Sequence, residues 1–127
     1  MYYIVDTEKS FERAVLDLEK AVINNKFGVL HIHNLGETLR NKGVEFVEEC
    51  KVFEVCNPNH SSVVMGIDMR VNMVLPCRIS VYTDGGRVNI GFIKPAPMLS
   101  TLSNDEVMGE VAREVEAAII KMVEDAK

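Results

Sequence analysis

Apolar and polar positions repeat with two different periods along this chain, and these periods predict its strands and helices. A period of two residues, typical of half-buried strands, marks residues 27–33, 73–82 and 87–93. Residues 2–6 and 46–56 are rich in β-branched and aromatic side chains and predict two further strands. The apolar face of residues 73–82 is expected to comprise Leu75, Cys77, Ile79 and Val81.

Two long helices are predicted from apolar residues that recur three or four positions apart. We expect Thr7 to cap the first, which ends at Asn24-Asn25. Ser103 and Glu106 form the S-x-x-E pattern of a capping box for the second. The buried stripes are expected to be Phe11, Ala14, Val15, Leu18 and Val22 in one helix, and Val111, Val115, Ala118, Ile119 and Met122 in the other.

Two short helices are predicted between strands. Asn34 with Glu37 is typical of a helix start, and Gly43 of a helix end. Asn57-Pro58 should begin a second short helix that runs to about Met69. Residues 94–102, with two prolines, are expected to form a stiff loop, and residues 84–86 a hairpin turn.

The element order is therefore β-α-β-β-β-β-α in a single domain spanning residues 1–127. An antiparallel sheet with the two long helices on one face is the simplest α+β arrangement for this order.

Charge and composition exclude several classes of function. The net charge is −5 and no Lys/Arg cluster is present, which argues against nucleic acid as a partner. No apolar stretch approaches the length of a membrane span, and the first residues do not resemble a signal peptide, so we expect a cytoplasmic protein. Three cysteines without a CxxC pair indicate reduced thiols rather than a disulfide framework.

Cys56 precedes Asn-Pro, and this placement makes it the first candidate for chemistry. Asn57 can cap the helix while Pro58 takes its first position, which leaves Cys56 just outside the helix and His60 in the first turn. A helix N-terminus favours a thiolate over a thiol. A small buried hydrophobe at a strand end is the alternative role for Cys56.

Pro76 and Cys77 form the second unusual stretch. A proline within a strand marks an edge or a bulge, and Cys77 shares a face with aliphatic residues, so a core role is one reading. If this strand pairs with the one ending at Cys56, the two thiols approach each other. Cys56, His60 and Cys77 would then form a three-ligand set suited to a soft metal.

His31 and His33 should project from one face of their strand, opposite Leu30 and Ile32. Such a pair can bind metal, line a pocket or simply form the polar face of a half-covered sheet. We expect this polar face, which includes Arg78, Ser80 and Tyr82, to serve as a dimer surface or a pocket wall.

Four stretches resemble the domain of unknown function 302 family: residues 10–22, 26–46, 53–61 and 75–82. The paired CNP and LPC motifs carry most of this resemblance, and Ser61 stands where family members tend to have alanine. The resemblance implies a TATA-binding-protein-like β-α-β4-α fold and a homodimer, but no reaction. It also favours a shared site that includes Cys56, Asn57, Pro58, Pro76 and Cys77.

Three functions stay open at this point. The first is a protein that binds a small ligand or a soft metal near Cys56 and Cys77. The second is a thiol-dependent enzyme or redox protein that uses Cys56, although no catalytic base is evident and no other catalytic motif is present. The third is a structural or interaction module in which both motifs only fix turns. We expect a binding protein rather than an enzyme.

Overall fold

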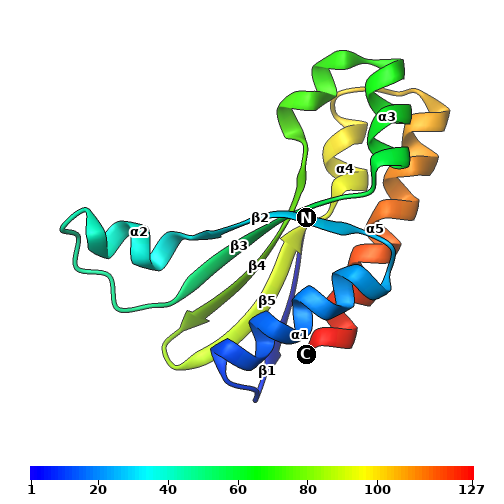
Figure 1. Cartoon of the computed structure of the whole chain (residues 1–127). Helices are drawn as coiled ribbons and strands as arrows, with labels where there is room; N and C mark the ends of the chain where they lie inside the picture. Colours follow the sequence, from blue (N-terminus) through cyan, green and yellow to red (C-terminus); the bar gives the residue numbers. More distant parts are fainter.

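Five strands form one antiparallel sheet in the computed structural model, which describes residues 1–127 (Figure 1). Their order across the sheet is β1-β5-β4-β3-β2, so the first two strands of the chain occupy opposite edges. The strands are β1 (Tyr2–Thr7), β2 (Gly28–Asn34), β3 (Cys50–Cys56), β4 (Cys77–Asp84) and β5 (Arg87–Ile93). The predicted β-α-β4-α order and α+β class are confirmed.

Helices α1 (Phe11–Asn24) and α5 (Glu106–Ala126) cover one face of the sheet, as predicted (Figure 1). Their apolar stripes meet the inward-facing residues of the central strands in a core that includes Phe53, Ile79 and Ile90, all fully buried. The opposite face of the sheet carries no helix. None of the helices combines the length and apolar composition needed to cross a bilayer.

Four shorter helical elements complete the fold: α2 (Leu35–Asn41), α3 (Pro58–Ile67), the 3₁₀ helix η1 (Met69–Val74) and α4 (Pro95–Ser100). Helix α2 lies on an arm that projects from the sheet, whereas α3 and α4 lie beside the N-terminal half of α5 (Figure 1). A second hydrophobic cluster joins α3, η1, α4 and α5 and is separate from the main core.

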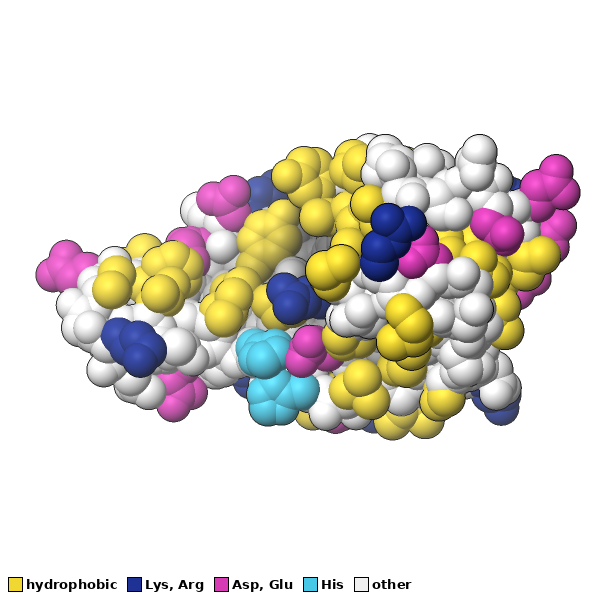
Figure 2. Space-filling model, turned by 90° about the horizontal axis from the view of Figure 1, so that it is seen from above, with side chains coloured by type: hydrophobic (Ala, Val, Ile, Leu, Met, Phe, Trp, Pro, Cys, Tyr) yellow, Lys and Arg dark blue, Asp and Glu magenta, His cyan; other side chains and the backbone are white.

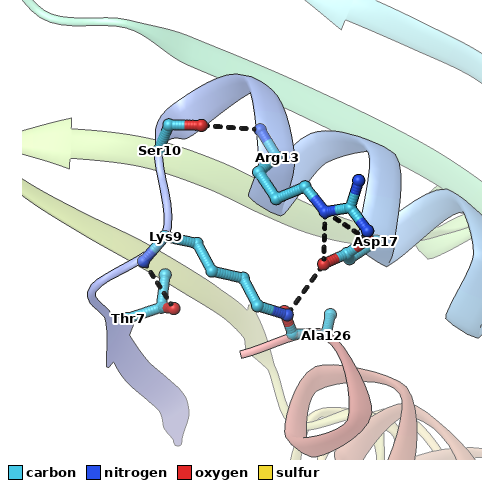
Figure 3. Close-up of polar contacts among 6 residues, drawn as sticks. All are labelled: Thr7, Lys9, Ser10, Arg13, Asp17 and Ala126. Atoms are coloured by element: carbon cyan, nitrogen blue, oxygen red, sulfur yellow. Dashed lines mark hydrogen bonds and ion pairs between the residues drawn. The ribbon is translucent and has the colours of Figure 1, made fainter.

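The predicted caps of the two long helices are wrong by two or three residues. Ser10, not Thr7, caps α1 by accepting a hydrogen bond from the Arg13 backbone N–H at 3.1 Å, while the Thr7 hydroxyl accepts from Lys9 N–H (Figure 3). Thr7 ends β1 because its backbone still pairs with Val88. Asp105, not Ser103, caps α5 by accepting from Met108 N–H at 2.9 Å, since a carboxylate at that position suits the helix dipole.

An ion pair and a hydrogen bond from Lys9 connect the two long helices near the ends of the chain. Lys9 Nζ donates to Asp17 Oδ2 at 2.8 Å and to the Ala126 carbonyl at 2.9 Å, which ties α1 to the end of α5 (Figure 3). The Lys9 ammonium lowers the pKa of the Asp17 carboxyl. The start of the chain and its last turn of helix are thereby held together.

Strand boundaries differ from the predictions at two places. Residues 46–49 are not part of β3, because the Arg40 guanidinium binds the carbonyls of Phe46 and Glu48, each at 3.1 Å. Strand β4 begins at Cys77, not at residue 73. Pro76 follows a cis Leu75–Pro76 bond and lies just before this central strand, not at a sheet edge or a bulge as predicted. A proline has no backbone N–H to donate to a neighbouring strand.

A β-bulge in β2 contradicts the prediction that Leu30 and Ile32 lie on the same face of the strand. The register with β3 shifts between Val29 and His31. Val29 and Ile32 therefore both pack against the core, while the Leu30 side chain is 61% exposed. His31 and His33 do lie side by side, with ring centroids 4.4 Å apart.

The segment predicted as a loop, residues 94–102, contains α4. Pro95 and Pro97 both fall in its first turn, where backbone N–H groups need no partner within the helix.

Candidate functional site

The N-terminus of α3 is built as the sequence predicted. The Asn57 side-chain oxygen accepts hydrogen bonds from the backbone N–H groups of Asn59 and His60, at 3.0 and 3.3 Å. Pro58 occupies the first helical position. Cys56 ends β3 immediately before this cap, so its thiol lies at the positive end of the helix.

Strand pairing brings the two motif cysteines together. Strands β3 and β4 are antiparallel neighbours, and Val55 lies directly opposite Cys77. Cys56 and Cys77 both line one small cavity, of about 30 Å³. The two motif cysteines therefore border the same cavity.

The cavity lies where the two hydrophobic clusters meet. Val55 and Val115 belong to the main core, whereas Val64 and Leu99 belong to the smaller cluster, and all four contribute to the cavity wall. Most of the wall is apolar, and its polar residues Asn57, His60 and Ser61 all come from the start of α3. The full lining is Phe27, Val55, Cys56, Asn57, His60, Ser61, Val64, Val74, Leu75, Cys77, Pro95, Met98, Leu99, Val111, Ala112 and Val115.

The two thiols differ in environment. Burial, together with the neighbouring Cys56, raises the pKa of Cys77 to about 11. Cys77 is therefore a neutral thiol at neutral pH. The Cys56 sulfur lies 3.3 Å from the Ser61 hydroxyl, within hydrogen-bonding distance for sulfur. Burial also raises the pKa of Cys50, which lies at the other end of β3 and outside the cavity.

The two ring nitrogens of His60 have different surroundings. Its Nε2 lies 3.4 Å from the Glu114 carboxylate on α5, and its ring packs against Phe27. Its Nδ1 is buried without a hydrogen-bond partner. A proton on Nε2 that faces Glu114 leaves Nδ1 with a free lone pair.

The predicted three-ligand metal set is not assembled in this structure. No group of three His, Cys, Asp or Glu side chains is arranged to hold a metal ion. Cys56, His60 and Cys77 do line the same cavity, but His60 is engaged with Glu114 instead of completing a ligand set with both thiols.

Pro76 lies on a different surface. It contributes to a groove of about 530 Å³ on the open face of the sheet, together with Arg78, Ser80 and Tyr82. Cavity and groove share a wall made of Val74, Leu75, Cys77, Pro95 and Met98. The groove therefore adjoins the cavity.

His31 and His33 border neither the cavity nor the groove. His33 Nε2 lies 2.8 Å from Glu54, and Arg78 lies 4.0 Å from the same carboxylate. Figure 2 shows histidine side chains together, next to acidic, basic and hydrophobic groups on the face seen from above. The structure thus separates the candidate residues into a thiol cavity and a charged row on the sheet.

Comparison with protein families gives a match over nearly the whole chain. The family described as Domain of unknown function DUF302 matches residues 3–126. The chain belongs to the DUF302 family. No curated protein matches it.

A solved DUF302 structure has the same fold. The crystal structure of an uncharacterized conserved DUF302 protein from Bacillus stearothermophilus superposes with a TM-score of 0.93 at 28% sequence identity. The alignment covers 99% of this chain and 98% of that one. The resemblance inferred from the CNP and LPC motifs is confirmed, and the family is one of unknown function.

Sequence reasoning missed one sulfur atom of this DUF302 cavity. Met98 lines the cavity from α4, within the segment that was expected to be a loop. Two prolines in the first turn of a helix were the available signal for α4. Nothing in the sequence, however, links residue 98 to Cys56 and Cys77.

Proposed function

We propose that this protein binds a small ligand or a soft metal ion in the cavity between Cys56, Cys77 and His60. One observation carries this proposal. Two thiols and a buried, unpartnered ring nitrogen gather at a single gap between two otherwise well-packed cores.

The free energy of the empty site supports a ligand. Leaving a buried polar atom such as His60 Nδ1 without a partner costs about 1–3 kcal/mol. A bound ligand, or a water molecule, recovers that cost. A cavity needs about 10–15 Å³ to hold one water, so a volume of about 30 Å³ suits an occupant of one or two heavy atoms.

The thiol-enzyme alternative has weaker support. A cysteine nucleophile needs an adjacent base or a lowered pKa, and the partner of Cys56 is the Ser61 hydroxyl rather than an imidazole. The raised pKa of Cys77 also makes it a poor nucleophile at neutral pH. Binding through reduced thiols suits a protein of the cytoplasm, where thiols stay reduced.

Native mass spectrometry of freshly purified protein tests the binding function for metals and small molecules together. Wild type should carry an extra mass that is lost in the Cys56→Ser/Cys77→Ser double variant and kept in Cys50→Ser. Elemental analysis of the same samples separates a metal from an organic ligand. If all three proteins show only the mass of their polypeptide chain, nothing is bound, and the structural role of the two motifs is the one that remains.

We also propose that two copies of the chain associate through the open face of the sheet. The helices cover only one face, and the other exposes the apolar side chains of Tyr2, Ile4 and Ile93. The row formed by His33, Glu54 and Arg78 offers charges of both signs on the same surface, so two copies can pair them.

A further inference from the structure

We propose that the cavity holds Cu(I) through three sulfur atoms: the thiolates of Cys56 and Cys77 and the thioether of Met98. This inference rests on the proposed binding function and names its ligand class. All three side chains line the same cavity, and they come from β3, β4 and α4.

The donor atoms select the ion. No Asp or Glu lines the cavity, which argues against Mg²⁺ and Ca²⁺ because these ions need several oxygen ligands. Zinc sites in proteins need three or four Cys, His or carboxylate ligands, and no such group of three is arranged here. Thiolates with a thioether are the soft ligands that Cu(I) prefers.

The size of the cavity supports a single ion over an organic molecule. Pockets for organic ligands usually have volumes of about 300–1,000 Å³. A volume of about 30 Å³ accepts one ion instead.

Met98 and Cys77 line both the cavity and the groove on the open sheet face. A thioether needs no deprotonation to bind, so Met98 can contact an ion in the groove before either thiol loses its proton. When the ion then binds both cysteines, the two thiols release two protons to solvent, and no electron is transferred.

Anaerobic titration with Cu(I) in competition with bicinchoninate, a Cu(I) chelator, tests this site. Wild type should bind one Cu(I) per chain. Removal of even an outer-shell partner commonly weakens metal binding about 10- to 100-fold, so Cys56→Ser, Cys77→Ser and Met98→Leu should each lose at least about tenfold. Circular dichroism and melting of the apoproteins show whether each variant is folded.

Two matched controls separate the site from general thiol and thioether binding. Cys50→Ser removes a cysteine outside the cavity, and Met73→Leu removes a methionine that lines the groove but not the cavity. Both should keep wild-type affinity. X-ray absorption at the copper edge of the wild-type complex should count three sulfur neighbours, which checks Met98 even if Met98→Leu does not fold.

The outcomes distinguish this inference from the proposed function. Cu(I) binding that needs both cysteines but not Met98, with two sulfur neighbours, overturns the three-sulfur site and leaves the cavity as the binding site. No cysteine-dependent Cu(I) binding overturns the ligand class altogether. In that case, an organic mass lost only from the double cysteine variant still supports the proposed function.

Discussion

At the residue scale, the two thiols of one cavity have different chemistry. Cys56 lies at the N-terminus of α3 with a hydroxyl beside its sulfur, whereas Cys77 is surrounded by apolar side chains on a central strand. Burial disfavours a thiolate at Cys77. Cys77 therefore becomes a ligand only when a metal displaces its proton.

Alkylation by iodoacetamide tests this difference, because the thiolate is the reacting species. At pH 7–8 we expect Cys56 to react fastest, Cys50 more slowly and Cys77 hardly at all. The rate at Cys77 should rise about tenfold per pH unit and level off only near pH 11. Site-resolved mass spectrometry measures all three rates in one sample. Fast labelling of Cys77 at pH 7, or equal rates at Cys50 and Cys56, would contradict this assignment.

The raised pKa of Cys77 also affects stability, with a sign that follows from proton binding. Below pH 9 both the folded and the unfolded chain keep this proton. Between pH 9 and about 11 the unfolded chain releases it while the folded chain retains it. The contribution of this thiol to stability therefore falls as the pH rises through that window.

Individual site residues were predictable where one local rule decides their position. Asn-Pro specifies a helix start, so Cys56, Asn57 and Pro58 could be placed from the sequence. The strand that contains Cys77 was also recognisable, and its pairing with the strand that ends at Cys56 was considered from the sequence and is present in the sheet. Met98 could not be assigned to the site, because its position depends on how α4 packs against α3 and α5.

At the element scale, helix α3 connects stability with the site through its cap. The Asn57 side chain accepts hydrogen bonds from two backbone N–H groups of the first turn, and Cys56 directly precedes Asn57. Asn57→Ala should lower the free energy of unfolding by about 1 kcal/mol, because both N–H groups lose their partner. Asn57→Asp should keep the cap, since a carboxylate accepts the same bonds and suits the helix dipole.

The two substitutions separate scaffold from site when both properties are measured on the same samples. The added carboxylate of Asn57→Asp places a negative charge beside the Cys56 sulfur, so alkylation of Cys56 should slow while the melting temperature stays near wild type. Asn57→Ala should instead lower the melting temperature. If Asn57→Asp leaves both the melting temperature and the labelling rate of Cys56 unchanged, the CNP motif only shapes the chain at the start of α3.

Elements that break their own periodic pattern were the ones that sequence reasoning misassigned. The bulge in β2 turns Leu30 outward, and a period-two pattern has no means of signalling an extra residue. Helix α4 has only six residues, too few for its apolar period to appear. The long helices and central strands repeat their pattern several times, so their type was predicted correctly and only their ends were wrong.

At the scale of the whole molecule, the fold buries one face of its sheet and leaves the other open. The helix side is fully buried at Phe53, Ile79 and Ile90. The open side exposes 72% of Tyr2, 50% of Ile4 and 48% of Ile93. Apolar groups of this size on neighbouring strands favour association, and a second copy of the chain supplies a matching surface.

Light scattering at micromolar concentrations tests the proposed dimer. Wild type should have twice the 14.2 kDa mass of one chain. Ile4→Lys should shift the protein toward monomer, because it places a charge in the middle of the apolar part of the open face. Ile23→Lys is the matched control, since Ile23 is a similarly exposed isoleucine, 60% accessible, on α1 at the helix side. A monomeric wild type, or equal loss of dimer in both variants, would show that the open face does not join two copies.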